Sequence, residues 1–145
     1  MSTNPAERFS IPVRVYYEDT DAGGVVYYAN YLRFLERART EWLRALGFEQ
    51  DDLRARLGIL FAVRRVSADY LRPARFNDRL EVTVEAARVG PASIEFKQEV
   101  RRGHETGWDT LCTASVRIAC LDAAQFGPRP MPPEIVERIK LGRVI

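Results

Sequence analysis

Residues 27–47, YYANYLRFLERARTEWLRALG, form the segment around which the rest of this chain is organised. Apolar residues recur in it every three or four positions, which predicts one long amphipathic helix from about Tyr27 to Leu46. Gly47 is a natural end for this helix. A helix so long and amphipathic has to lie against a flat apolar surface. The apolar stripe consists of Tyr31, Leu32, Leu35, Ala38, Trp42, Leu43 and Leu46, with Arg33, Glu36, Arg37, Glu41 and Arg44 tending to the other side.

Predicted strands that precede and follow this helix in the sequence supply such a surface. Phe9–Tyr17 alternates, with Val13 and Val15 on one face. After a short helical piece at Glu49–Leu57, four long segments alternate as strands with one buried and one wet face, as in an antiparallel meander. Pro133–Lys140 is predicted to be a terminal helix with proline at its start. The four strands are expected at Ile59–Leu71, Arg79–Val89, Ser93–Arg101 and Trp108–Leu121.

This order of elements predicts an α+β fold with a long central helix against one curved antiparallel sheet. We expect a single domain over residues 1–145, with a tail at 1–8 and a Pro-rich C-terminal extension at 128–145 that carries the short helix. Such a sheet leaves edges uncovered. Pairing two sheets edge to edge would remove those edges, so a homo-oligomer is expected.

Composition excludes several functional classes. The chain has 145 residues, of which 46% are apolar and 29% charged, as in one globular domain. The net charge of +2 and the scattered arginines argue against nucleic-acid binding. No apolar run approaches the roughly 20 residues of a membrane span, and residues 1–12 lack the apolar core of a signal peptide, so a cytoplasmic location is expected.

Histidine and cysteine usage limits the possible chemistry. His104 is the only histidine and falls in a glycine-rich turn, which excludes a site with several histidine ligands. Cys112 and Cys120 lie eight residues apart in one predicted strand, so they point to the same face. We interpret them as reduced structural thiols. No metal or organic cofactor is expected.

The residues before the helix carry the candidate chemistry. A helix start has unpaired N–H groups and a partial positive charge, so it can hold and polarise a carbonyl oxygen. Gly23 and Gly24 allow another molecule to approach the backbone, and Asp21 supplies a carboxylate beside that point. The alternative is that Asp21 is a turn aspartate bound to nearby backbone N–H groups, which the residues alone favour. Asp19 is expected to brace the loop.

A long motif covers most of the chain. It comprises Val13, Arg14, Asp19-Thr20-Asp21-Ala22-Gly23-Gly24-Val25-Val26-Tyr27, Asn30-Tyr31-Leu32, Glu36-Arg37-Ala38-Arg39, Trp42-Leu43, Tyr70-Leu71-Arg72-Pro73-Ala74-Arg75 and Pro128-Arg129-Pro130-Met131-Pro132. This motif resembles the 4-hydroxybenzoyl-CoA thioesterase/YbgC family of acyl-CoA thioesterases. The resemblance implies a hot-dog fold, in which a sheet wraps the central helix, and dimers that commonly pair into tetramers. In Gram-negative bacteria the YbgC branch is associated with the Tol-Pal envelope system.

Site residues follow from this resemblance by position. It implies that Asp21 is the catalytic carboxylate and that the Tyr28 backbone N–H is the oxyanion donor. YbgC-type members often carry histidine at position 28, and a phenol is a poor base near neutral pH, so only the backbone role carries over. Asp21 would act as nucleophile or as general base, and both remain open. Expected substrate contacts are Gly23, Gly24, Val25, Tyr27, Asn30 and Tyr31. Arg72, Arg75 and Arg88 sit at predicted strand ends or turns and are candidates for the CoA phosphates, although surface solvation explains them equally well.

The resemblance implies hydrolysis of a short-chain or aromatic acyl-CoA to the free acid and CoA. A second hypothesis is a non-catalytic hot-dog scaffold that binds acyl groups, acyl carrier protein or envelope-complex partners, although an intact Asp21 argues against it. A hydratase or dehydratase is disfavoured because it usually relies on a motif histidine that is absent here. Asn30 could bond the loop of its own chain or a partner subunit, and the tyrosines could belong to the core or to the acyl site.

Overall fold

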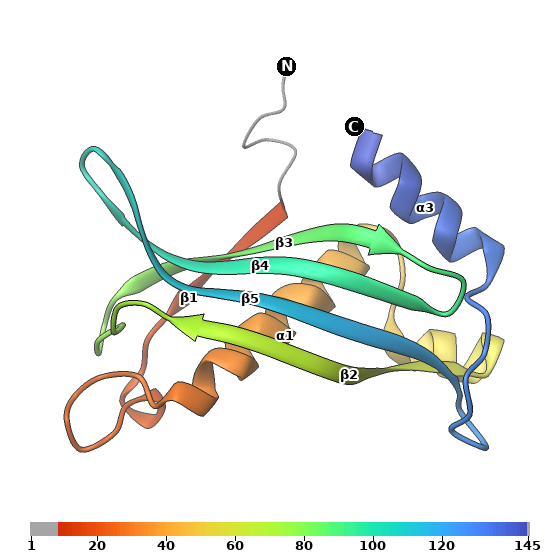
Figure 1. Ribbon diagram of the computed structural model, residues 1–145, viewed down its shortest axis with the longest axis horizontal. Coiled ribbons are helices and arrows are strands. Elements are labelled where there is room, and N and C mark those ends of the chain that lie inside the picture. Colours follow the sequence, from red (N-terminus) through yellow and green to blue (C-terminus); the bar gives the residue numbers. More distant parts are fainter. Residues whose placement is uncertain (1–8, 145) are drawn as a thin grey trace.

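The computed structural model describes residues 9–144, so the predicted tail at 1–8 and residue 145 lie outside the described residues. A single domain contains five strands and one long helix (Figure 1). The elements are β1 (Phe9–Arg14), α1 (Tyr28–Ala45), α2 (Gln50–Asp52), β2 (Ile59–Tyr70), β3 (Arg79–Val89), β4 (Ser93–His104), β5 (Gly107–Asp122) and α3 (Pro133–Val144). A 3-10 turn at Tyr17–Asp19 replaces the predicted end of the first strand, and Leu53–Leu57 forms a π-helical turn.

The five strands form one antiparallel sheet in the order β1-β3-β4-β5-β2. The predicted meander holds for β3, β4 and β5, which pair in succession. It is wrong for β2, which pairs with β5 at the far edge of the sheet. Because β1 and β4 occupy both sides of β3, β2 cannot lie beside β3, and it pairs with β5 instead. The loop at 71–78 carries the chain across the end of the sheet.

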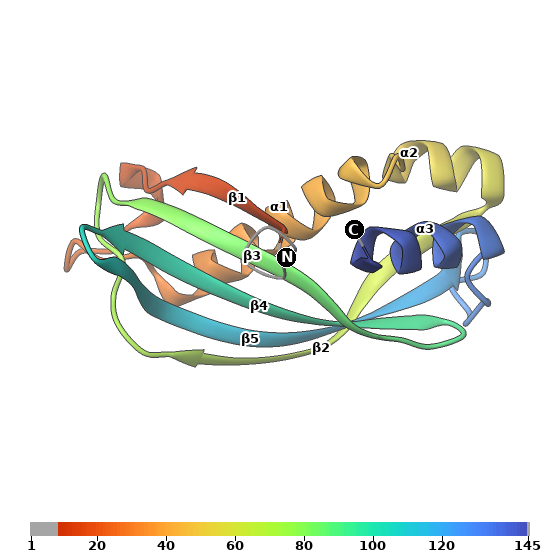
Figure 2. The same ribbon diagram turned by 90° about the horizontal axis from the view of Figure 1, so that it is seen from above.

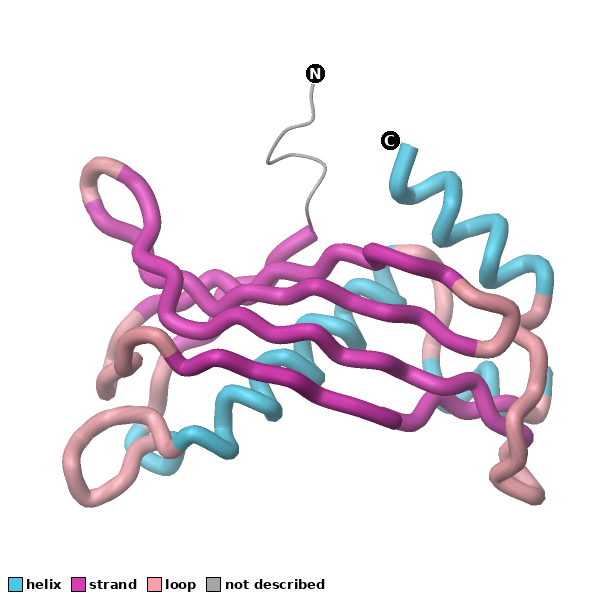
Figure 3. Tube along the Cα trace, viewed as in Figure 1, coloured by secondary structure: helices cyan, strands magenta, loops and turns pink. Residues whose placement is uncertain are grey.

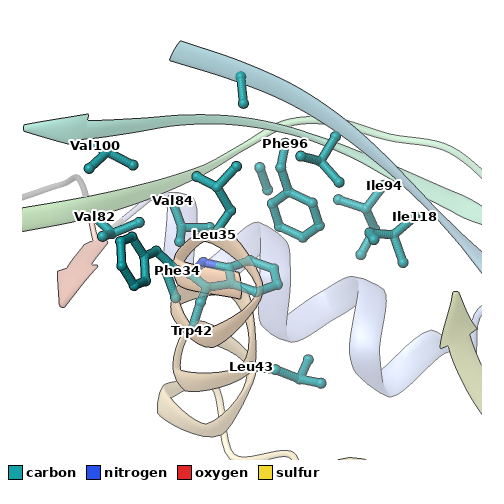
Figure 4. Packing of buried hydrophobic residues seen from close by; sticks show 14 of the residues in the cluster. Phe34, Leu35, Trp42, Leu43, Val82, Val84, Ile94, Phe96, Val100 and Ile118 are labelled. Carbon is teal, nitrogen blue, oxygen red and sulfur yellow. The ribbon is translucent and has the colours of Figure 1, made fainter. Parts of the chain in front are cut away.

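Helix α1 lies across one face of this curved sheet, and no helix within residues 9–144 covers the other face (Figures 2 and 3). Trp42 packs edge-on against Phe96 of β4 with ring centroids 5.1 Å apart (Figure 4). The predicted helix stripe is confirmed, with a small rotation. Phe34 is fully buried although it was not assigned to the stripe, whereas Leu32 is 39% exposed. At about 100° per residue, the buried positions 34, 35, 38 and 42 lie within about 60° of position 31, whereas position 32 lies about 100° away. Leu43, on the same side as Leu32, is buried near the other end of the helix.

Cys112, Cys120 and His104 lie in the kinds of position that the sequence predicts. Cys112 and Cys120 are free thiols, both fully buried on the helix-facing side of β5, as predicted. His104 is exposed where the β4–β5 hairpin turns. Within residues 9–144, no group of three or more His, Cys, Asp or Glu side chains is arranged to hold a metal ion. In the same range, none of the helices has the length and apolarity needed to cross a bilayer.

Candidate active site

A tight turn stands immediately before α1, in the loop drawn in orange in Figure 1. Thr20 and Val26 form an antiparallel bridge at its base, and the Asp21 N–H donates to the Val25 carbonyl at 2.9 Å. The Gly24 N–H closes the turn on the Asp21 carbonyl at 3.0 Å. Gly24 has φ +81°, a left-handed conformation that a residue without a Cβ adopts at little cost. The turn therefore holds Asp21 close to the start of the helix.

The Asp21 side chain is exposed on this turn. Its Oδ1 accepts a hydrogen bond from the Gly23 N–H at 2.8 Å, which is the geometry of a turn aspartate. Among the described residues, no hydrogen bond to its Oδ2 is formed. The bond to Gly23 thus orients the carboxylate and leaves one oxygen available to a ligand.

The start of α1 leaves N–H groups open. Tyr28 is the first residue of α1, so no carbonyl of the helix can accept its N–H. Within the described part of the chain, α1 has no side-chain cap and no acidic residue in its first turn. The Tyr27 N–H is taken by the Asp19 carbonyl at 3.0 Å, and the Asn30 N–H by the Tyr27 carbonyl at 2.8 Å. Tyr28 therefore presents an uncapped donor at the positive end of an 18-residue helix.

Asp19 and Asn30 fix this helix start. The Asn30 Nδ2 donates to the Asp19 carbonyl at 2.9 Å, so Asn30 bonds the loop of its own chain. The buried Asp19 carboxylate accepts the Tyr16 N–H at 2.8 Å. Asp19 braces the loop, as expected from the sequence.

The loop at 71–78 supports the turn from the side. The Val26 N–H donates to the Ala74 carbonyl at 2.8 Å, and Val25 forms a bridge with Arg75. Tyr31 lies in the core, where its hydroxyl accepts the Ala74 N–H at 3.0 Å. Tyr31 is therefore placed to position this loop, because its ring does not reach the surface.

The three candidate arginines lie in different places. The exposed Arg75 is brought beside Val25, next to the turn. Arg72 forms an ion pair with Asp109 at 3.3 Å. Arg88 lies near the opposite end of β3 from Arg79, about 30 Å away at about 3.3 Å per residue, so the structure separates it from the turn.

Exposed tyrosines surround the start of α1. Tyr27, Tyr28 and Tyr70 are 47%, 60% and 45% exposed. Ring centroids are 4.8 Å apart for Tyr27–Tyr28, and 6.0 Å apart in an edge-on arrangement for Tyr28–Tyr70. Tyr70 is not among the site residues predicted from the sequence, because nothing local connects the end of β2 with the start of α1. The one feature of the sequence that pointed to Tyr70 was its place in the motif segment at 70–75.

Comparisons with known proteins show which family this chain belongs to. Residues 15–139 match the model of the thioesterase-like superfamily. The acyl-CoA thioesterase YbgC of Haemophilus influenzae is 46% identical over 127 residues, covering 88% of this chain and 90% of the relative. A "probable thioesterase" from Bartonella henselae superposes with a TM-score of 0.79 at 34% identity, covering 86% and 99% of the two chains. A mutant 4-hydroxybenzoyl-CoA thioesterase complexed with 4-hydroxybenzoyl-CoA superposes with a TM-score of 0.85 at 18% identity, covering 92% and 99%.

A helix lying across one curved antiparallel sheet, in a chain with these relatives, defines a hot-dog-fold thioester hydrolase. The chain belongs to the thioesterase-like superfamily, in the 4-hydroxybenzoyl-CoA thioesterase/YbgC family. The resemblance and the fold class inferred from the sequence are both confirmed.

Proposed function

We propose that this protein hydrolyses an acyl-CoA thioester to the free acid and CoA, with Asp21 and the Tyr28 backbone N–H as its catalytic groups. The observation that carries the proposal is the uncapped start of α1 at Tyr28, beside the exposed Asp21 turn. The YbgC relative, named as an acyl-CoA thioesterase, supports the same substrate class.

The helix start would act on the thioester carbonyl. With the carbonyl oxygen near the Tyr28 N–H, negative charge would develop on that oxygen as the carbonyl carbon is attacked. One donor aimed at this position is worth roughly 3–4 kcal/mol in the transition state. The positive end of the helix dipole acts in the same direction.

Asp21 would supply the second group, by one of two routes. In the first, a carboxylate oxygen attacks the carbonyl carbon, the carbon–sulfur bond breaks and CoA leaves as a thiolate that takes a proton from water; water then hydrolyses the mixed anhydride. In the second, the carboxylate takes a proton from a water molecule as that water attacks the same carbon. The carbon–sulfur bond then breaks, and the departing CoA thiolate takes the proton from the Asp21 carboxyl group. The Asp21 Oδ2 serves either route, since Oδ1 is engaged by the Gly23 N–H.

Contacts to the rest of the substrate follow from the positions of the surrounding residues. Gly23, Gly24, Val25 and Tyr27 would lie along the bound thioester, whereas Asn30 and Tyr31 would hold the site in shape. Arg75 is the better placed candidate for the CoA phosphates, because Arg72 is already paired with Asp109. The proposal requires no cofactor apart from the CoA of the substrate.

We further propose a homodimer or homotetramer. β2 forms a sheet edge over 12 residues, and its side chains Val63 and Val66 are exposed. Pairing this edge with a second copy would satisfy its free backbone groups and cover these side chains. Light scattering on the purified protein tests the oligomeric state. A cytoplasmic location is proposed on the sequence pattern given above, and an envelope-complex link on the family resemblance alone.

The alternative function is a non-catalytic scaffold that binds acyl groups, acyl carrier protein or envelope-complex partners. The hydrogen bond between Asp21 Oδ1 and the Gly23 N–H favours it, because a purely structural turn aspartate has the same geometry.

CoA release from acetyl-, butyryl-, benzoyl- and palmitoyl-CoA, followed with a thiol reagent, separates the two functions. The thioesterase proposal predicts saturable turnover of at least one of these substrates. Binding measured by calorimetry, without turnover of any of them, would instead support the scaffold. The Glu18→Gln variant, which removes an exposed carboxylate from the same loop, serves as a control and is expected to retain turnover.

A further inference from the structure

An ion pair attaches the loop at 71–78 to the sheet. Nη1 of Arg102 on β4 donates to Oδ2 of Asp78 at 2.9 Å and to the Pro73 carbonyl at 3.4 Å. The two side chains are partly buried, with 28% of Arg102 and 22% of Asp78 exposed. Water and salt therefore screen this pair less than an ion pair on the open surface. The loop, the end of β4 and the start of α1 lie at the same end of the sheet (Figure 1).

Asp78 connects this ion pair to the middle of the loop. The carboxylate oxygen that accepts from Arg102 also accepts the Arg75 N–H at 2.9 Å. The Asp78 N–H in turn donates to the Arg75 carbonyl at 3.1 Å. Two hydrogen bonds thus close the short turn between Arg75 and Asp78, and the guanidinium of Arg102 balances its negative charge.

The middle of the loop contacts the candidate active site directly. The Ala74 carbonyl accepts the Val26 N–H at 2.8 Å, and Arg75 forms a bridge with Val25. Val25 and Val26 belong to the turn that carries Asp21, and α1 begins two residues after Val26. A continuous series of bonded contacts therefore runs from β4, through the loop, to the proposed catalytic groups.

We propose that Arg102 is a positioning residue of the enzyme, which holds the Asp21 turn and the Tyr28 N–H in place through Asp78 and the loop. This inference rests on the proposed function, because it assigns a role in the same site to a residue that acts through its neighbours. Without Arg102, the Asp78 carboxylate loses its cation and the loop loses this attachment to β4. Misplacing a catalytic group by about 1 Å can lower a rate about 100-fold, so a partial loosening of the turn is enough to slow the reaction.

A similar ion pair at the other end of the sheet provides a matched control. Nη1 of Arg129 donates to the Gly58 carbonyl at 2.9 Å and lies 3.4 Å from Oδ1 of Asp122. Like Arg102, Arg129 joins a carboxylate to a backbone carbonyl. Gly58, however, directly precedes β2 and lies at the opposite end of that strand from Tyr70, which contacts the start of α1.

Kinetics and hydrogen exchange together test the proposal on the wild type, Arg102→Gln, Arg102→Lys and Arg129→Gln. The first measurement is kcat and KM for acetyl-, butyryl-, benzoyl- and palmitoyl-CoA. The second is the exchange rate of the Val26 amide by NMR, which reports on its bond to Ala74 without any need for turnover. Urea unfolding of each protein shows how much overall stability is lost.

We expect Arg102→Gln to lower kcat about tenfold, with KM changed less than about twofold, because positions that matter in the transition state are disturbed. The Val26 amide should exchange about five- to tenfold faster in Arg102→Gln than in Arg129→Gln. Arg102→Lys keeps the positive charge and should retain more of kcat than Arg102→Gln. Arg129→Gln should lower the urea midpoint by a similar amount but leave kcat at the wild-type value.

Unchanged kcat in Arg102→Gln, or equal falls in Arg102→Gln and Arg129→Gln, would overturn the proposal, because the pair would then act on stability alone. Equal Val26 exchange rates in these two variants would also overturn it, since the loop would not transmit the effect. Faster exchange in Arg102→Gln, with no turnover by any of the four proteins, would support the role of Arg102 in holding the turn and would contradict the proposed hydrolysis.

Discussion

The side-chain amide of Asn30 donates a hydrogen bond to the backbone carbonyl of Asp19 at 2.9 Å. The same carbonyl accepts the Tyr27 N–H at 3.0 Å, so one acceptor ties both the N-cap residue and the first turn of α1 to the preceding loop. The Tyr27 N–H is therefore occupied by the Asp19 carbonyl, and the Tyr28 N–H is the next backbone donor along the chain. The orientation of the proposed oxyanion donor therefore depends on Asn30.

Replacing Asn30 by alanine should cost stability and, more strongly, turnover. Loss of the hydrogen bond should lower the free energy of unfolding by about 1 kcal/mol. Because the Tyr28 N–H would be less well held, kcat should fall more than KM rises. Denaturant unfolding and steady-state kinetics measure the two effects. Gln50→Ala removes an exposed amide that bonds Thr40 and should leave kcat unchanged; equal kcat losses in both variants would contradict this role for Asn30.

The two glycines of the turn should respond differently to alanine. Gly24 has a left-handed φ and open space at its Cβ position, so Gly24→Ala should cost about 1 kcal/mol through the backbone alone. Gly24→Asn should recover part of this loss, because asparagine tolerates the left-handed region. Thermal unfolding of the two variants measures the effect. Equal stability of wild type and Gly24→Ala would show that the turn relaxes to another conformation.

Gly23→Ala should act on turnover rather than on stability. Gly23 has no left-handed φ, but an added Cβ would lie 3.3 Å from the Asp21 Oδ1 and would shift that oxygen by a few tenths of an ångström. We expect a clear loss in kcat with a change in unfolding free energy below about 0.5 kcal/mol. Kinetics and unfolding measured on the same preparation decide this point; unchanged kcat would indicate that the position of Asp21 matters little.

A buried polar network below α1 should be important for stability. Gln98 is 2% exposed; its Nε2 donates to the carbonyls of Leu35 and Thr83 at 3.1 and 3.2 Å, and its Oε1 accepts from Arg39 at 3.0 Å. Gln98→Leu leaves the Thr83 carbonyl and the Arg39 guanidinium without these bonds, so it should cost about 2 kcal/mol.

Urea unfolding of Gln98→Leu, Arg39→Leu and the double variant tests this network. The double variant should lose less than the sum of the single losses, because removing Arg39 also removes the unpaired charge. Strict additivity would mean that Arg39 and Gln98 do not stabilise each other.

Cys112 should make stability fall at alkaline pH. Burial, and then the charge of Asp69, raise the pKa of this thiol from 9.0 to about 11. The folded state therefore holds the proton more tightly than the unfolded state, so this contribution is complete below about pH 9 and is lost as pH rises toward 11. Cys112→Ala should show a shallower fall in unfolding free energy between about pH 9 and 11. Identical slopes would contradict the raised pKa; the pKa of Cys120 is also raised by burial, and its contribution remains in both proteins.

Periodicity predicted the elements well and their neighbours less well. The predicted strand at Arg79–Val89 matches β3, and the predicted helix differs from α1 by one residue at each end. Alternation specifies which face of a strand is buried, but it carries no information on which strand lies beside it. For this reason the sequence did not predict that β2 pairs with β5.

Local contacts of the site were predictable and long-range ones were not. The turn geometry of Asp21 and the bracing role of Asp19 both involve residues within a few positions, where the chemistry of Asp side chains limits the options. The sequence left the partner of Asn30 open, and it could not pair Tyr28 with Tyr70, because that contact forms only when β2 returns past the start of α1.

The catalytic role that we propose for Asp21 is tested by the rate of CoA release by Asp21→Asn compared with wild type. Asparagine keeps an oxygen that can accept the Gly23 N–H, so the turn and the melting temperature should be preserved. We predict a fall in kcat of about 100-fold or more, the usual effect of removing a general base or nucleophile. A rate within about threefold of wild type in a fully folded Asp21→Asn protein would contradict the catalytic role of Asp21, because the loss would be far smaller than this usual effect.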